Sequence, residues 1–100
     1  MKVFLDDARP TPEGWLRTYS VKETIDLLLT GDVTHLSLDN DLGFLDYKTE
    51  GYNVLNWLEE HIENNSDFVI PEITIHSANV SRRQSMQMTI DRLLRKKLWK

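Results

Sequence analysis

The sequence contains no cysteine, so disulfide bonds and thiolate metal sites are both excluded. It has no apolar run near the roughly 20 residues that a membrane-spanning helix needs, and its apolar start is too short for a signal peptide. No internal repeat, low-complexity tract or domain linker divides the 100 residues. We therefore expect a single domain over residues 1–100, in the cytoplasm and without membrane contact.

Acidic and basic residues are unevenly distributed along the chain. Residues 1–81 carry fifteen acids and five lysines or arginines, a net charge of −10, whereas residues 82–100 carry seven basic residues and one acid, a net charge of +6. A basic final segment can attract nucleic acid or acidic ligands. It can also balance the acidic body and suit the C-terminal end of a helix, which is the simpler interpretation. The pattern leaves both interpretations open, and it predicts no readout of a DNA sequence.

Alternating strand and helix patterns predict the fold class. Four strands are expected at residues 2–5, 15–19, 35–38 and 72–76. Three helices are expected between Ser20 and Gly31 after a Ser20/Glu23 capping box, at residues 52–62, and from a Ser81/Gln84 capping box onward. Apolar spacing predicts their buried stripes: Val21, Ile25, Leu28 and Leu29; Val54, Leu55, Leu58 and Ile62; Met86, Ile90, Leu93 and Leu94. The order β-β-α-β-α-β-α predicts an α/β fold, a parallel sheet of about four strands with three helices.

The strand sequences also indicate how the sheet is covered. "HLSLD" and "EITIH" alternate between apolar and polar residues, which favours helices packed mainly on one face. The opposite face would be thinly covered, and Phe4, Trp15 and Tyr19 are candidates to line it. That face could meet the last helix, solvent or a second copy of the chain, so self-association into a homo-oligomer is an open expectation.

Polar segments follow three of the predicted strands: Asp6-Asp7-Ala8-Arg9, Asp39-Asn40-Asp41 and His76-Ser77-Ala78-Asn79. Ligands of open parallel sheets bind beyond the carboxyl ends of the strands, so these segments are expected to meet at one rim. Two carboxylates ~4 Å apart repel by ~4 kcal/mol at an effective dielectric constant of 20. Such a cluster needs a hard cation or basic side chains, and Mg²⁺ favours carboxylate oxygens while keeping waters that can bridge to phosphate.

These motifs resemble those of response-regulator receiver domains, which have a flavodoxin-like fold. "FLDD", "LSLDND" and "IHSA" match the receiver's acidic pair, key aspartate and Ser/Thr-Ala motif, and "GYNVLNWL" resembles its glycine-led third helix. The resemblance is to a shortened receiver. "ARPTPEGW" replaces the helix after the first strand, and the fifth strand, whose lysine holds a phosphoryl group, has no counterpart.

Taken together, "FLDDARPTPEGW", "LSLDNDLG" and "IHSAN" resemble the cyclic-phosphate processing receiver-like family. This resemblance implies metal-aided processing of cyclic phosphates rather than phosphorelay. The sequence departs from the family at Asn40, where a histidine between the two aspartates is expected. If that histidine is an acid or base, Asn40 cannot replace it and His76 must serve.

The motifs assign candidate roles. The metal candidates are Asp6, Asp7, Asp39 and Asp41, with Asp41 alternatively ordering the loop that follows it. His76 and Asp39 are the catalytic candidates, and His76 could instead be a structural hydrogen-bonded group. The substrate-binding candidates are Arg9, Ser77, Asn79 and Arg82, of which Arg9 could instead neutralise the carboxylates and Arg82 could be a surface residue.

Three functions remain in competition. The first is metal-aided hydrolysis of a phosphodiester, specifically a cyclic phosphate on a nucleotide or RNA end, with Mg²⁺ as the expected metal. The second is an atypical receiver that accepts a phosphoryl group on Asp39. The third is a binding module without catalysis, for a nucleotide, a phosphate or a protein partner.

Overall fold

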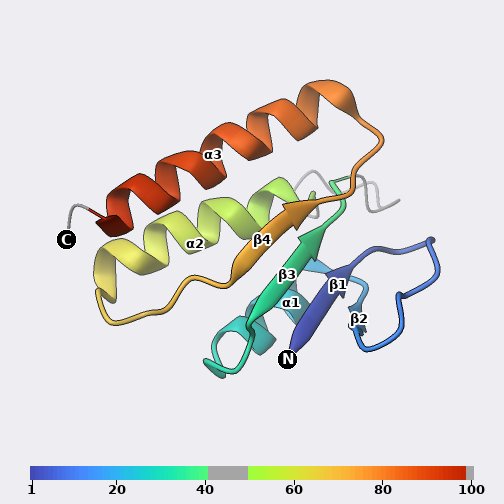
Figure 1. The fold of residues 1–100 in the computed structure, drawn as a ribbon, viewed down its shortest axis with the longest axis horizontal. Helices are drawn as coiled ribbons and strands as arrows, with labels where there is room; N and C mark the ends of the chain where they lie inside the picture. The colour runs from blue at the N-terminus through green and yellow to red at the C-terminus, as the bar shows by residue number, and fades with distance from the viewer. Residues whose placement is uncertain (41–49, 99–100) are drawn as a thin grey trace.

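The computed structural model describes residues 1–40 and 50–98, with side chains as far as Lys96. The elements are β1 Lys2–Leu5, β2 Leu16–Thr18, α1 Val21–Leu28, β3 His35–Leu38, α2 Tyr52–Asn64, β4 Glu72–Ile75 and α3 Val80–Leu98 (Figure 1). Their order confirms the predicted β-β-α-β-α-β-α arrangement. Within the described residues, no helix combines the length and apolarity needed to cross a membrane.

The four strands form one parallel sheet in the order β2-β1-β3-β4. Leu5 pairs with Thr18 on one side and with Leu38 on the other, and Leu38 pairs with Ile75. This register brings the carboxyl ends of the strands to one rim, which confirms the predicted α/β receiver-like fold. β2 is a three-residue edge strand that follows β1 without an intervening helix.

All three helices pack against the same face of the sheet. The hydrophobic core joins apolar side chains of β1 and β3 to those of the helices: Val3, Leu5, Leu28, Val33, Leu36, Leu38, Val54, Leu55, Leu58, Ile62, Met86, Ile90 and Leu93. In Figure 1, α1 lies behind β1 and β3. The prediction of one covered face is therefore confirmed, and α3 belongs to the covered side.

Two helices bury different residues from those predicted. Leu29 is 57% exposed and Leu94 is 47% exposed, so both predictions were wrong. In α1 the buried positions are Thr24 and Leu28, because the Thr24 hydroxyl bonds the buried Thr18 hydroxyl of β2 at 2.7 Å. On the buried side of α1, a pair of threonines thus takes the place that hydrophobicity alone assigned to Leu29.

The predicted start of α1 is confirmed, and the predicted start of α3 is corrected. Ser20 Oγ accepts the Glu23 amide N–H at 3.2 Å, as the predicted capping box requires. α3, however, begins at Val80 rather than after Ser81. Its first turn is capped by Asn79, whose Oδ1 accepts the Arg82 amide N–H at 3.1 Å.

Candidate functional site

Three aspartates converge at the rim where β1 and β3 end. The Asp39 amide donates to the Leu5 carbonyl at 3.0 Å, so the ladder continues one residue past the strands and holds Asp39 beside Asp6. Carboxylate oxygens of Asp6, Asp7 and Asp39 lie within 4.8 Å of one another. Asp6 is 1% and Asp39 8% exposed, while Asp7 is more open to solvent. These three residues could hold a metal ion.

Asp6 is firmly fixed by its neighbours. Its Oδ1 accepts the amide N–H groups of Ala8 and Arg9 at 2.8 and 3.0 Å, and its Oδ2 lies 3.1 Å from His76 Nε2. Burial raises the pKa of Asp6, but the two amide bonds and His76 outweigh it, so the pKa is lowered overall. Asp6 is therefore an ionised carboxylate with a fixed orientation.

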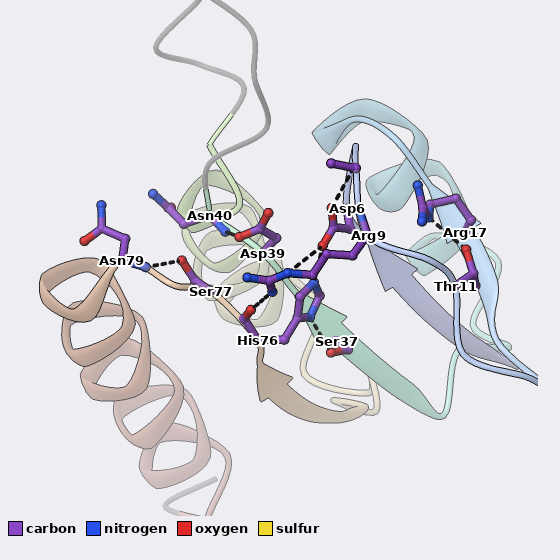
Figure 2. Close-up of polar contacts among 11 residues, drawn as sticks. Asp6, Arg9, Thr11, Arg17, Ser37, Asp39, Asn40, His76, Ser77 and Asn79 are labelled. Carbon is purple, nitrogen blue, oxygen red and sulfur yellow. Dashed lines mark hydrogen bonds and ion pairs between the residues drawn. The ribbon is translucent and has the colours of Figure 1, made fainter.

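His76 connects Asp6 to the sheet face opposite the described helices. Its Nδ1 lies 2.7 Å from Ser37 Oγ (Figure 2). Its ring stacks on Phe4 with centroids 4.3 Å apart. Burial lowers the pKa of His76 despite the opposing effect of Asp6, which favours the neutral ring. Because an ionised Asp6 can only accept, Nε2 of the neutral ring donates to Asp6 and Nδ1 accepts from Ser37.

Asp39 has less compensation for its charge. Among the described residues it accepts one hydrogen bond, from the Asn40 amide to Oδ1 at 2.8 Å. Burial and the nearby charge of Asp6 raise the pKa of Asp39, with Asn40, His76 and Arg9 opposing them more weakly. A buried carboxylate whose ionisation is disfavoured gains from a bound cation, so the donor set fits a hard divalent metal.

Asn40 has a structural role at the start of α2. Its backbone carbonyl accepts the Gly51 amide at 2.9 Å, and its Oδ1 accepts the Tyr52 amide at 3.1 Å. The residue is 1% exposed. Gly51 itself supplies no side-chain cap, so Asn40 satisfies the helix end from the neighbouring strand. This amide acts as an acceptor for the backbone and cannot serve as an acid or base.

The predicted phosphate-binding residues have defined contacts. Arg9 Nε lies 4.0 Å from Asp6 Oδ2, and its Nη1 donates to the His76 carbonyl. Arg9 therefore neutralises the acidic rim and fastens the segment after β1 to the end of β4. Ser77 is buried, and its Oγ accepts the Asn79 amide at 3.1 Å, which shapes the turn into α3.

Arg82 is directed towards α2. Its Nη2 lies 3.2 Å from Glu50 Oε2, and its guanidinium lies 5.7 Å from the centre of the Tyr52 ring. The described contacts of Arg82 are thus with the start of α2 rather than with Asp6. Asp41 lies outside the described residues, so its predicted metal role stays a prediction.

Comparison with protein families identifies the chain. The family model of the cyclic-phosphate processing receiver domain matches residues 1–92. The chain belongs to this family. No curated protein and no solved structure matches the sequence.

In this cyclic-phosphate processing receiver domain, sequence reasoning missed Ser37. The register places Ser37 beside Thr74, and His76 lies two residues further along the same face of the sheet. That offset was the available signal, because residues two apart on a strand share a face. The identity of the bonded partner depends on a contact between residues 39 positions apart, which no local pattern contains.

Protonation of His76 should destabilise the receiver domain as the pH falls below 6.5, whereas Asp39, whose folded pKa is raised, acts in the opposite direction. The folded pKa of His76 is lowered, so the unfolded chain binds the proton more readily and protonation favours unfolding. Asp6 adds a loss in the same direction below its unfolded value of 3.8, because its folded pKa is also lowered. Urea denaturation with EDTA at pH 7.5 and 5.5 measures the effect, and His76→Gln should reduce the difference. An unchanged difference in that variant would contradict the assignment to His76.

Proposed function

We propose that this domain hydrolyses a cyclic phosphodiester on a nucleotide or RNA end, with Mg²⁺ bound at the acidic rim. The observation that carries the proposal is the pair of buried carboxylates, Asp6 and Asp39, of which Asp39 has a raised pKa. Such a pair at the carboxyl rim of a parallel sheet suits a cation and, beyond it, a phosphate. The family description supplies the cyclic phosphate.

Asp6, Asp7 and Asp39 would hold the metal. When bound, Mg²⁺ polarises the phosphoryl oxygens and lowers the pKa of a coordinated water. The backbone amides of Ala8 and Arg9 orient Asp6, so one ligand is positioned before the metal arrives. The buried negative charge of Asp39, which is unfavourable on its own, would be compensated by contact with the bound cation.

His76 and Asp6 would form the proton-holding pair of the site. Nε2 of His76 lies 3.1 Å from Asp6 Oδ2, and the ring is 18% exposed. The neutral ring would take up a proton released during the reaction at Nδ1, in place of the hydrogen bond from Ser37, and the resulting imidazolium would be paired with ionised Asp6. We therefore assign the role of proton carrier to His76, next to Asp6 as a metal ligand.

Arg9 is the strongest candidate for holding the phosphate. Its side chain is 44% exposed although it lies beside buried Asp6, so the guanidinium can turn towards a bound anion. Ser77 and Asn79 would contribute from the turn that precedes α3, whose first amides favour negative charge. Arg82 could join them only by releasing Glu50.

A turnover panel tests the function. The purified domain is incubated with 2′,3′-cyclic and 3′,5′-cyclic nucleotides, with Mg²⁺ or with EDTA, and the products are separated by chromatography. We expect hydrolysis of at least one cyclic substrate in Mg²⁺ and loss of that activity in EDTA.

Other outcomes point elsewhere. Absence of turnover across the panel with Mg²⁺ present would refute the hydrolase, and tight binding of an unchanged nucleotide would favour a binding module. A stable mass gain of one phosphoryl group after incubation with a small phosphoryl donor would instead favour a receiver modified on Asp39.

A further inference from the structure

Edge strand β2 and the residues on either side of it present a row of flat side chains on the sheet face opposite the described helices. Trp15, Arg17 and Tyr19 are spaced two residues apart, and we call them the β2 stripe. The Arg17 guanidinium lies 5.1 Å from the Tyr19 ring centre and 5.8 Å from that of Phe4. Trp15 meets Phe4 edge to face at 6.3 Å. Tyr19 is 52% exposed and Trp15 half-buried, so both rings reach solvent.

Basic groups accompany these rings. Lys2 Nζ lies 5.8 Å from the Trp15 ring centre, and Arg17 Nε donates to Thr11 Oγ1 at 2.9 Å. Within the described part of the chain, neither Lys2 nor Arg17 forms an ion pair. Their charges stand out in a segment, residues 1–81, whose net charge is −10. The face therefore combines π surfaces with positive charge that no described carboxylate neutralises.

The β2 stripe ends beside the acidic rim. The Asp6 amide donates to the Thr18 carbonyl at 3.1 Å, so Tyr19 follows the residue that pairs with the end of β1. Neighbouring strands lie about 4.8 Å apart, which is within the span of one nucleotide. Figure 2 shows Arg17 on the side of Asp6 away from Asp39. Stacking of Phe4 on His76 makes the surface continuous with the site.

We propose that the β2 stripe binds the bases of a single-stranded RNA end whose terminal cyclic phosphate lies at Asp6 and Asp39. This inference rests on the proposed function and specifies its substrate class. Trp15 and Tyr19 are separated along the strand by about 13 Å, which is about the length of two extended nucleotides. Tyr19 is closer to the rim and takes the terminal base, while Trp15 takes the base two nucleotides before it. Lys2 and Arg17 face the backbone phosphates.

A second copy of the chain fits this face less well than RNA does. Phe4 is the largest apolar side chain at the centre of the face, and it is only 7% exposed because neighbouring side chains cover it. Ser37, Thr74 and Glu72 occupy the rest of the face. A stable homodimer needs about 800 Å² of well-packed surface from each partner, mostly apolar at its centre. Stacking on exposed rings needs no such area.

The test compares three cyclic phosphates: a base-free glycerol cyclic phosphate, a mononucleotide 2′,3′-cyclic phosphate and a trinucleotide ending in that group. Tyr19→Ala should lower kcat/KM for both nucleotides relative to the base-free compound by about tenfold. Trp15→Ala should lower it for the trinucleotide relative to the mononucleotide. Tyr19→Phe keeps the ring and should retain the preference. Leu16→Ala, on the opposite face of β2, is the matched control, and thermal melts check that each variant folds.

Failure of this inference and failure of the proposed function are distinguishable. If the stripe variants change all three substrates equally, the stripe does not bind bases even though the hydrolase stands. If no substrate is hydrolysed, fluorescence anisotropy of a labelled oligonucleotide with a 3′-terminal cyclic phosphate decides the question. Weaker binding by Tyr19→Ala and Trp15→Ala supports the inference, and unchanged binding overturns it. A dimer that Tyr19→Ala dissociates in sedimentation would also overturn it, in favour of self-association.

Discussion

Replacing Asp39 with asparagine should abolish turnover and, in the absence of metal, make the protein more stable. Asp39→Asn removes a carboxylate at the centre of the acidic rim, and we expect activity to fall on the order of a thousandfold or more. The Asn40 amide can still donate to the remaining side-chain oxygen, so local geometry is retained. The two effects have opposite signs because the same charge that would bind metal is unfavourable without it.

The sign of the stability change follows from the pKa. Burial and Asp6 raise the pKa of Asp39 in the folded state, so its contribution to stability is lost as the pH rises through that value. At pH 7 in EDTA, neutral asparagine should therefore raise the melting temperature. Wild type should gain about 2.7 kcal/mol at a Mg²⁺ concentration of 100 times Kd, and Asp39→Asn should gain almost nothing.

Asp67→Asn is the matched control for this experiment. It makes the same chemical change at an exposed residue between α2 and β4 and should alter neither activity nor the response to Mg²⁺. Thermal melts in EDTA and in Mg²⁺, with turnover measured in parallel, complete the set. If Mg²⁺ stabilises Asp39→Asn as much as it stabilises the wild type, Asp39 is not a metal ligand.

A methyl group at Gly51 should give the largest loss of stability. A Cβ built there would lie 1.8 Å from the Asp39 carbonyl oxygen, which is part of the backbone and cannot rotate away. Gly51 has φ −55° and ψ −30°, so alanine would otherwise suit the start of a helix. We expect Gly51→Ala to lower the free energy of unfolding by about 1–3 kcal/mol, or several degrees in Tm. Because Asp39 must shift, Mg²⁺ affinity should fall as well.

Gly31→Ala is the control that distinguishes the clash at Gly51 from a general loss of stability. Gly31 has φ +81°, and a Cβ there would meet nothing within 4 Å. Its substitution should cost on the order of 1 kcal/mol through backbone strain while leaving Mg²⁺ affinity unchanged. Calorimetric Mg²⁺ titration of both variants is the measurement. Equal affinities in Gly51→Ala and wild type would show that the start of α2 and Asp39 adjust independently.

The convergence of the site residues could be predicted from the sequence because it depends mainly on the register of the strands. Once β1, β3 and β4 are parallel neighbours, the residues after Leu5, Leu38 and Ile75 must meet at one rim, whatever the details of packing. Asp6, Asp39 and His76 could therefore be placed together from strand patterns alone. Their roles in chemistry did not follow from that placement.

What could not be predicted depends on contacts between distant side chains. The bond from Ser37 to His76 and the Asn40 cap on α2 both join elements far apart in the chain. The predicted burial of Leu29 and Leu94 was wrong for a related reason. The apolar stripe of a helix is wider than the surface that it buries, and the tertiary packing partners decide which edge of the stripe stays exposed.

Because the described helices all pack on one side of the sheet, its two faces have different roles. Side chains such as Leu36 and Leu38 maintain the fold, whereas Trp15, Arg17 and Tyr19 can be exchanged without opening a cavity among the helices. Substrate preference can therefore diverge among descendants of such a domain at small thermodynamic cost. For an engineer, the same asymmetry makes the helix-free surface the first place to randomise when a new ligand is sought.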